Sequence, residues 1–282
     1  MTTAPQPGEL AGAWTADPGL LLAITATTVV YVLGVRRAGG LGTTVNGRQA
    51  IAFGAGIVAL VVALVSPLEA LAEALFAAHM VQHLLLTLVA APLLLLGRIH
   101  HAVTPLLPLD LRRSWGRRLA RAARRVGPGL LVLAVGVHVG TVVAWHVPAL
   151  YDLAASSAPA HGLEHLTLLG SAVGFWAVMG AARPRPVAAA GLAAFVTSLV
   201  FVGLAALLTS APTPWYGPHL TTTQPFGLTP LEDQQLAAAI MWVPGGMVYL
   251  GAAAAAILRW IRADERALRV GAHDPAVPGG PS

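Results

Sequence analysis

Seven long apolar runs, separated by short polar or arginine-rich segments, dominate the hydrophobic pattern of the chain. A helix rises ~1.5 Å per residue, so a helix that crosses the ~30 Å hydrocarbon core of a bilayer needs about 20 predominantly apolar residues. The runs that approach or exceed this length cover approximately residues 19–35, 49–65, 75–97, 129–147, 161–182, 187–209 and 234–259. The pattern predicts an all-α polytopic membrane protein, a bundle of seven transmembrane helices.

The positions of the arginines give these helices a direction. All 17 basic residues are arginines, and they follow the first, third, fifth and seventh runs, whereas the other connections and the N-terminal segment contain none. Basic residues collect in the cytoplasmic loops of membrane proteins. Seven spans with the N-terminus outside and the C-terminus in the cytoplasm place every arginine on the cytoplasmic side, and adding or removing one helix would destroy this alternation.

The rest of the chain contains no segment of the size of a soluble domain. Residues 1–18 are expected to form a short extracytoplasmic tail, 19–260 one membrane domain, and 261–282 a cytoplasmic C-terminal tail. Two spans contain helix-breaking residues. Pro92 predicts a kink near the inner end of the third span, and Pro244 with the two glycines after it predicts a bend in the seventh.

The basic loop at residues 98–128 has a pattern of its own. Among its eight arginines, apolar residues recur at near-helical spacing, namely Leu111, Trp115, Leu119 and Val126. This pattern is typical of an amphipathic helix that lies in the membrane interface. An ordinary solvated basic loop fits the sequence equally well.

Composition excludes several classes of function. With 56% hydrophobic and 10% charged residues, the chain is far more apolar than a soluble domain of its size. The absence of cysteine excludes disulfides, thiolate metal sites and CxxC redox chemistry, and the absence of lysine excludes a retinal Schiff base. The net charge of +5 comes from arginines at helix ends. Membrane topology explains that charge, so we expect no nucleic-acid partner.

Two pairs of histidines need an explanation, because polar side chains are costly inside a membrane and usually face a bundle interior or a partner. His79 and His83 in the third run, like His161 and His165 in the fifth, have the i, i+4 spacing that puts both rings on one helix face. The topology places both pairs in the outer half of the membrane. Neutral imidazole is the commonest metal ligand, so we predict a metal or cofactor site here. A polar network that braces the helices is the alternative.

Other polar residues are candidates to complete this site. His146, in the sequence WHVP after the fourth run, is either a further ligand or an interfacial residue. Glu164, between His161 and His165, is a ligand, a partner that orients an imidazole, or an interfacial charge. His138 lies deeper in the fourth run, and a hydrogen bond between helices is the more common role for such a residue.

Four more residues are weaker candidates. Met80 and Met241 are possible soft ligands, although methionine in an apolar helix usually serves packing. Asp233 and Gln234 stand at the mouth of the seventh run, where their position favours capping of that helix. We therefore expect these residues to be additional or supporting members of the site.

The donor set limits the choice of metal. Imidazole suits zinc, copper, iron and nickel, and a set of histidines and methionines is compatible with copper in either oxidation state. The absence of thiolates argues against a structural zinc site. Histidines from different helices at one depth also suit axial ligation of haem. No motif in the chain distinguishes copper from haem.

Four segments, taken in order, resemble the signature segments of the CtaG-type cytochrome c oxidase assembly factors: HMVQHLLLTLVAAPLLLLG, WHVPALYD, HGLEHLTLLGSAVGFW and LEDQQLAAAIMWVPGG. The resemblance covers nearly all seven spans. It implies a polytopic plasma-membrane protein required for an active haem–copper oxidase, with copper delivery to an oxidase subunit as the role usually proposed. The family's marked positions correspond to His79, Gln82, His83, Trp145, His146, Tyr151, His161, Glu164, His165, Asp233, Gln234 and Met241.

We therefore expect a non-catalytic assembly factor that holds copper at an outward-facing histidine site and passes it to the oxidase. A redox protein that binds haem or quinone through the same histidines, a transporter that uses His138 and Glu164, and a scaffold without metal are the alternatives. The chain contains no GxSxG, P-loop or HExxH motif, so nothing in it favours hydrolytic chemistry.

Overall fold

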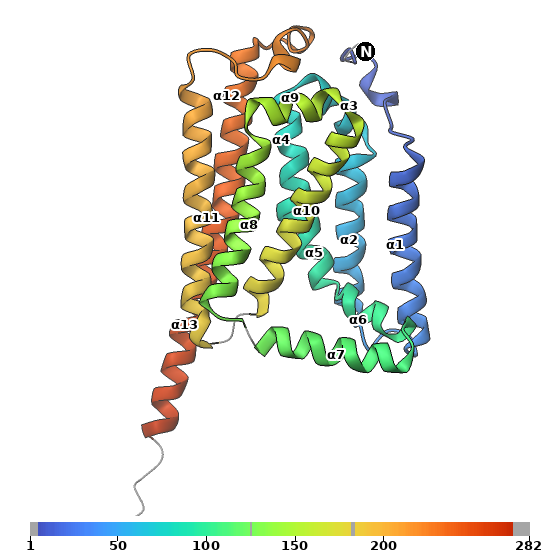
Figure 1. Cartoon of the computed structure of the whole chain (residues 1–282), viewed down its shortest axis with the longest axis vertical. Coiled ribbons are helices and arrows are strands. Elements are labelled where there is room, and N and C mark those ends of the chain that lie inside the picture. Colours follow the sequence, from blue (N-terminus) through green and yellow to red (C-terminus); the bar gives the residue numbers. More distant parts are fainter. Residues whose placement is uncertain (1–4, 125, 182–183, 273–282) are drawn as a thin grey trace, which may run out of the picture.

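The computed structural model describes residues 5–124, 126–181 and 184–272, and within these ranges every regular element is a helix (Figure 1). Seven helical segments are long and apolar enough to cross a membrane, as the hydrophobic pattern predicts. In chain order they are α1 (Pro18–Arg37), α2 (Gly47–Leu64), α4 to α5 (Phe76–Leu96), α8 (Pro128–Trp145), α10 (Ala158–Ala181), α11 (Pro184–Ser210) and α12 to α13 (Pro230–Glu265).

The two ends of the bundle carry different short elements (Figure 1). One end holds the helices α3 (Pro67–Ala74) and α9 (Pro148–Ser156) together with the 3-10 turn Gly217–Leu220, and the N-terminal segment lies on the same side. The opposite end holds α6 (Ile99–Val103) and α7 (Leu109–Arg124). We call these the α3–α9 end and the α7 end.

The basic loop folds into a helix. Helix α7 lies across the α7 end, roughly perpendicular to the spans (Figure 1). Leu111 and Trp115 are exposed on it, while the side chain of Leu119 is outside the described residues and Val126 follows the end of the helix. The predicted amphipathic helix is therefore present, and its exposed apolar residues are of the kind that enter a membrane interface.

Two spans are interrupted by a π-helical turn. In the third span, α4 (Phe76–Leu84) leads into the π-turn Leu85–Ala90 and then α5 (Ala91–Leu96), so the helix is irregular in the turn just before Pro92. A proline lacks the N–H that would bond to the carbonyl four residues earlier, and for Pro92 that residue is Leu88, within the π-turn. A π-turn frees backbone groups, and the indole of Trp176 donates a 2.9 Å hydrogen bond to the carbonyl of Thr87 within it. Such turns are frequent at functional sites.

The seventh span is interrupted where the sequence predicts it. Helix α12 (Pro230–Ile240) leads into the π-turn Met241–Gly246, which contains Pro244, and then α13 (Met247–Ala272). Proline has no backbone N–H, so a regular hydrogen bond is lost at this place. Helix α13 continues to Ala272, well past the predicted end of the span at Arg259, and residues 273–282 lie outside the described part of the chain.

The spans pack around a core of aromatic residues. Helix α11 runs along α13, and α10 packs against both α8 and α5. The largest cluster of buried residues contains Phe76, Tyr151, Phe175, Phe201 and Tyr249, which belong to five different helices. Large apolar side chains are also exposed along the outside of α1, α2, α8 and α11. A bundle that is apolar inside and outside suits a lipid environment.

Candidate metal-binding site

The third span brings His79 and His83 to one buried position near the α3–α9 end. Both lie on α4, where the i, i+4 spacing puts their rings one above the other, with centroids 4.1 Å apart. Both side chains are almost entirely buried. Polar side chains at such a depth usually have a partner or line a cavity, so their ring nitrogens locate the site.

The fifth span faces this pair with its own pair of histidines. His161 and His165 lie on α10, with ring centroids 4.2 Å apart. The ring of His161 is nearly parallel to that of His79, at 5.7 Å between centroids, and the ring of His165 is 5.7 Å from that of His83. The structure thus brings together the two pairs that the sequence could only place at a similar depth.

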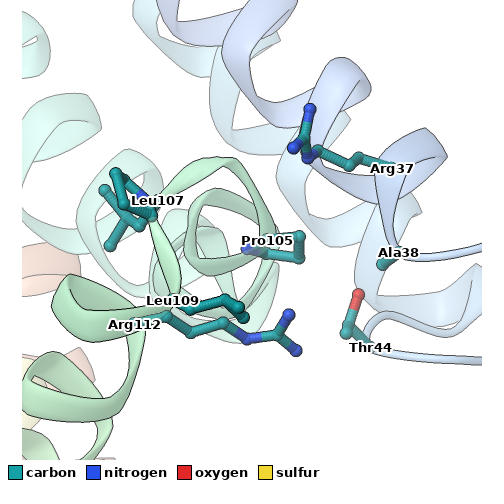
Figure 2. A pocket seen from close by; sticks show the side chains of 8 residues that line it. Arg37, Ala38, Thr44, Pro105, Leu107, Leu109 and Arg112 are labelled. Atoms are coloured by element: carbon teal, nitrogen blue, oxygen red, sulfur yellow. The ribbon is translucent and has the colours of Figure 1, made fainter.

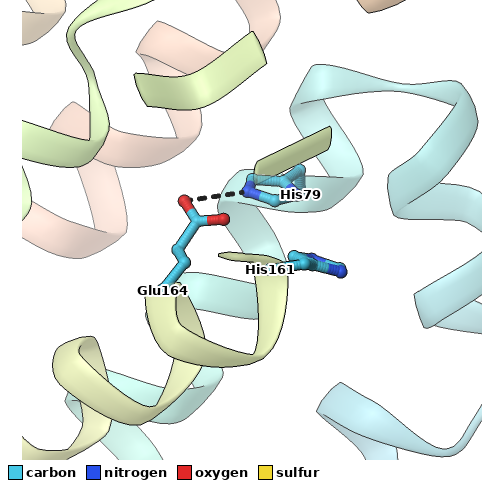
Figure 3. A group of neighbouring side chains, drawn as sticks. All are labelled: His79, His161 and Glu164. Atoms are coloured by element: carbon cyan, nitrogen blue, oxygen red, sulfur yellow. Dashed lines mark ion pairs between the residues drawn. The ribbon is translucent and has the colours of Figure 1, made fainter. Parts of the chain in front are cut away.

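The carboxylate of Glu164 lies against the pair on the third span. Its Oε1 atom is 3.5 Å from Nε2 of His79 and 3.5 Å from Nε2 of His83, and Figure 3 shows its carboxylate directed at the His79 ring. His79, His161 and Glu164 each place one ligand atom within 4.8 Å of the others. Donors bonded at ~2.0 Å to one tetrahedral metal lie about 3.3 Å apart. The two 3.5 Å distances from Glu164 to His79 and His83 are therefore close to the spacing of neighbouring ligands of one ion.

A fifth imidazole comes from the end of the fourth span. His146 caps the C-terminus of α8, and its Nδ1 donates a 2.7 Å hydrogen bond to the carbonyl of Val142. This bond leaves the lone pair on Nε2, which is the arrangement found in metal-ligating histidines. His146 and His83 line a small cavity of about 20 Å³, together with Met80 and Met241, so both candidate thioethers lie beside the histidines.

The most informative feature of the cluster is the number of its buried polar atoms that have no hydrogen-bond partner. A buried polar atom without a hydrogen bond is costly, and most are satisfied in native proteins. Among the described residues, however, unpartnered buried atoms are concentrated here: Nε2 of His79, both ring nitrogens of His83, Nε2 of His146, His161 and His165, and both carboxylate oxygens of Glu164. One bound cation would satisfy several of them at once.

Glu69 lies at the outer rim of the site. Its Oε1 is 3.7 Å from Nδ1 of His161, and its other oxygen accepts a very short hydrogen bond from Gln82. Burial raises the pKa of Glu69 to about 7. The side chains of Glu69 and His161 are 17% and 22% exposed, whereas Glu164 is fully buried. The cluster is therefore reached from the α3–α9 end through this rim.

Glu69 is not among the residues predicted for the site, because α3 is only eight residues long and precedes the apolar run of the third span. The available signal was the repeat LEALAEAL, whose leucines recur at helical spacing with Glu69 between them.

The sequence of the chain matches a known protein family. Residues 29–263 match the sequence model of a family described as the cytochrome c oxidase caa3 assembly factor. The chain belongs to this family. No curated protein and no solved structure gives a match.

Asp233 of this assembly factor has a different role from the two considered in the sequence. Both of its carboxylate oxygens accept backbone hydrogen bonds from the start of α4, from Phe76 at 2.7 Å and from Ala77 at 3.0 Å. It therefore caps the third span and not its own helix. The seventh span is capped by Thr229, which forms a reciprocal pair of hydrogen bonds with Glu232.

The polar side-chain atoms of Gln234 and His138 likewise form hydrogen bonds with residues outside the histidine cluster. Gln234 accepts from the backbone N–H of Trp215 at 2.7 Å and donates to the carbonyl of Leu208 at 2.9 Å. His138 lies eight residues before His146 on α8, ~12 Å along the axis. Its two ring nitrogens bond to Ser171 at 3.1 Å and to Tyr249 at 2.6 Å, so it links three spans.

A second polar network supports the site in the assembly factor. The ring of Tyr151 on α9 is 5.2 Å from that of His79, and its hydroxyl is 2.5 Å from Nε2 of His219. Nδ1 of His219 is 3.3 Å from the carbonyl of Ala74. If Nδ1 carries the proton and donates to Ala74, then Nε2 accepts from Tyr151. Burial lowers the pKa of His219 to about 4, which favours this neutral ring.

Proposed function

We propose that this assembly factor binds a copper ion at the cluster of His79, His83, His146, His161, His165 and Glu164, and delivers it to a copper-containing subunit of the oxidase. The observation that carries the proposal is the concentration of unpartnered nitrogen and oxygen atoms, contributed by three spans, around the Glu164 carboxylate. Copper is the cargo in this role and not a resident cofactor, so the proposed function is not catalytic.

The donor set supports copper over the other candidates. Imidazole binds copper in both oxidation states, and thioethers select the soft Cu(I) ion. Met80 and Met241 line the cavity next to His83 and His146. That cavity, at about 20 Å³, is about large enough for one water-sized species and far too small for a haem. An ion therefore fits the site better than a macrocycle does.

The arrangement also offers a path for loading and release. The half-buried pair Glu69 and His161 stands at the rim, Glu164 lies behind it, and His83 with His146 is the innermost part. A cation is attracted first by the rim carboxylate and then exchanges water for imidazole. A site with more donors than one ion needs lets the ion move between ligand sets, which suits a protein that must release its metal.

The arginines support an extracytoplasmic position for this site. They are concentrated at the α7 end, with Arg36 and Arg37 at the end of α1 and others on α7, whereas the histidine cluster lies toward the α3–α9 end. By the positive-inside rule the α7 end faces the cytoplasm. We therefore propose that the copper site opens to the outer face of the plasma membrane, where a client subunit of the oxidase receives the ion.

The proposal is tested by measuring the copper content of purified protein after exposure to copper and removal of the excess. We expect wild type to retain copper and the double variant His79→Ala, His83→Ala to lose it. The double variant His100→Ala, His101→Ala is the matched control, since it removes two histidines from α6 at the opposite end. Equal copper in all three proteins would remove the cluster from the proposed role. Full oxidase activity in cells that carry only the His79, His83 variant would favour a scaffold.

A further inference from the structure

A second site lies at the α7 end, away from the histidine cluster. It is a cavity of about 480 Å³ between the end of α1 and the start of α7, which is within the range of small-ligand sites. Figure 2 shows Arg37 and Arg112 on opposite sides of it, with Pro105 and Thr44 between them. The leucines Leu107 and Leu109 add apolar surface to its wall.

The polar groups of this cavity suit an anion. Two guanidinium groups line it, and none of the described residues that line it is acidic. The hydroxyl of Thr44 is buried there and has no hydrogen-bond partner. Arginine forms strong, paired hydrogen bonds with phosphate oxygens, and a hydroxyl supplies one more donor. The three groups therefore match the oxygens of one phosphate.

The start of the 16-residue α7 forms part of the cavity wall, through Pro108 and Leu109. The N-terminal end of a helix carries a partial positive charge. Asp110, the next residue, is exposed and is not part of the lining. The charge inside the cavity is therefore positive.

The walls of the cavity are held in place by close helix packing. Helix α1 packs against α6 and the turn after it, and a Cβ atom at Gly34 would lie 1.7 Å from the carbonyl oxygen of Ala102. Only glycine permits this approach. Gly34 is one turn before Arg37, so the contact fixes the distance between Arg37 and the segment that carries Pro105 and Arg112. The cavity is thus part of the packed fold.

We propose that this cavity binds the phosphate headgroup of an anionic phospholipid. It lies beside the end of a transmembrane span and the start of the amphipathic α7, and the ends of spans are where a bilayer has its headgroups. Anionic lipids attract clustered arginines at membrane surfaces. The apolar Leu107 and Leu109 suit the glycerol and acyl portion of a lipid better than a free, fully hydrated phosphate.

The test is native mass spectrometry of the purified full chain with phosphatidylglycerol, with phosphatidylcholine, or with inorganic phosphate. We expect selective retention of phosphatidylglycerol, and at least about tenfold weaker retention in the double variant Arg37→Gln, Arg112→Gln, since it removes the charge-assisted hydrogen bonds to the phosphate. The double variant Arg117→Gln, Arg118→Gln is the matched control, because it removes the same charge from exposed positions of α7 outside the cavity. Thr44→Val is expected to weaken retention by a smaller factor.

Three results would overturn this proposal. Equal retention in the cavity variant and the α7 control would show non-specific attraction to a basic surface. Equal retention of phosphatidylcholine and phosphatidylglycerol would show that the cavity does not select lipids with an anionic headgroup. Displacement of the lipid by millimolar inorganic phosphate, together with retention of phosphate itself, would assign the cavity to a free anion. The copper content of the same variants is expected to stay at the wild-type level, so this test is independent of the proposed function.

Discussion

The carboxylate of Asp233 on α12 accepts a 2.7 Å hydrogen bond from the backbone N–H of Phe76, the first residue of α4. The same carboxylate accepts a second bond from the next N–H along the chain. The first turn of a helix has unsatisfied N–H groups and a partial positive charge, both of which a carboxylate neutralises. The seventh span therefore fixes the start of the helix that carries His79 and His83.

Replacing this cap is expected to loosen the copper site without removing a ligand. Asp233→Ala leaves two buried N–H groups without acceptors, which we expect to lower the free energy of unfolding by ~1–3 kcal/mol and to reduce copper retention. Thermal unfolding in detergent, with copper analysis, measures both effects. Asp110→Ala, an exposed acidic residue at the opposite end, is the control. Unchanged stability and copper content in Asp233→Ala would contradict the capping role.

Removing the negative charge of Glu164, which lies beside His79 and His83, is expected to weaken the binding of Cu(II). Glu164→Gln keeps the size of the side chain and removes its negative charge, so we expect an affinity at least about tenfold lower, the size of effect seen when groups around metal ligands are changed. Competition with a chelator of known affinity measures it. Glu73→Gln on α3, an exposed acidic residue near the same end, is expected to bind as wild type does. A wild-type affinity in Glu164→Gln would exclude the carboxylate as a ligand.

The two methionines are expected to distinguish the oxidation states of copper. The double variant Met80→Leu, Met241→Leu approximately conserves the volume of the core and removes both thioethers beside His83 and His146. We expect a lower affinity for Cu(I), because thioethers favour this soft ion, and an unchanged affinity for Cu(II). Parallel titrations under reducing and oxidising conditions separate the two. If both affinities stay at the wild-type value, the methionines serve only packing.

The buried His219 is expected to make the stability of the metal-free protein depend on pH. Burial lowers its folded-state pKa to about 4 from the ordinary histidine value of 6.5. The unfolded chain therefore binds more protons between these values, so the stabilisation is complete above pH 6.5 and is lost as pH falls toward 4. The full effect is up to about 3 kcal/mol.

The measurement compares wild type with His219→Asn at several pH values. We expect the stability advantage of wild type to be largest near pH 7 and to shrink toward pH 4, because the asparagine has no charge to gain. Other buried histidines titrate in both proteins, so only the difference between the two is informative. A constant difference across this range would mean that the pKa of His219 is the same in the folded and the unfolded chain, which would contradict the lowered pKa.

The hydrophobic pattern was sufficient to predict the seven spans, since lipid imposes a length and an apolar composition on each of them. The i, i+4 spacing of the histidines predicted the helix face shared by His79 and His83 and the face shared by His161 and His165. The meeting of these faces depends on the order and rotation of the helices, which one sequence does not specify. The structure supplies that information, and it places His146, already a candidate from the sequence, beside His83.

Other features of the site depend on contacts between distant parts of the chain. Asp233 follows a sequence pattern for capping its own helix, yet its partner Phe76 is 157 residues away. Glu69 lies on a helix too short to register as a span. The π-turn after His83 has no proline within it, but it contains Leu88, whose carbonyl lies four residues before Pro92 and loses its regular hydrogen bond there. Pro92 therefore predicted an irregularity in this stretch, whereas its π-helical form was not predictable from residue type.

The most direct test of the account is X-ray absorption at the copper edge of the copper-loaded protein. We predict nitrogen and oxygen donors at ~2.0 Å with the multiple-scattering pattern of imidazole, since metal–histidine bonds have this length. This pattern is expected to disappear in the His79→Ala, His83→Ala variant and to persist in the His100→Ala, His101→Ala control. A protein that binds no copper, or a spectrum that is identical in the two variants, would contradict the claim that these histidines hold the metal.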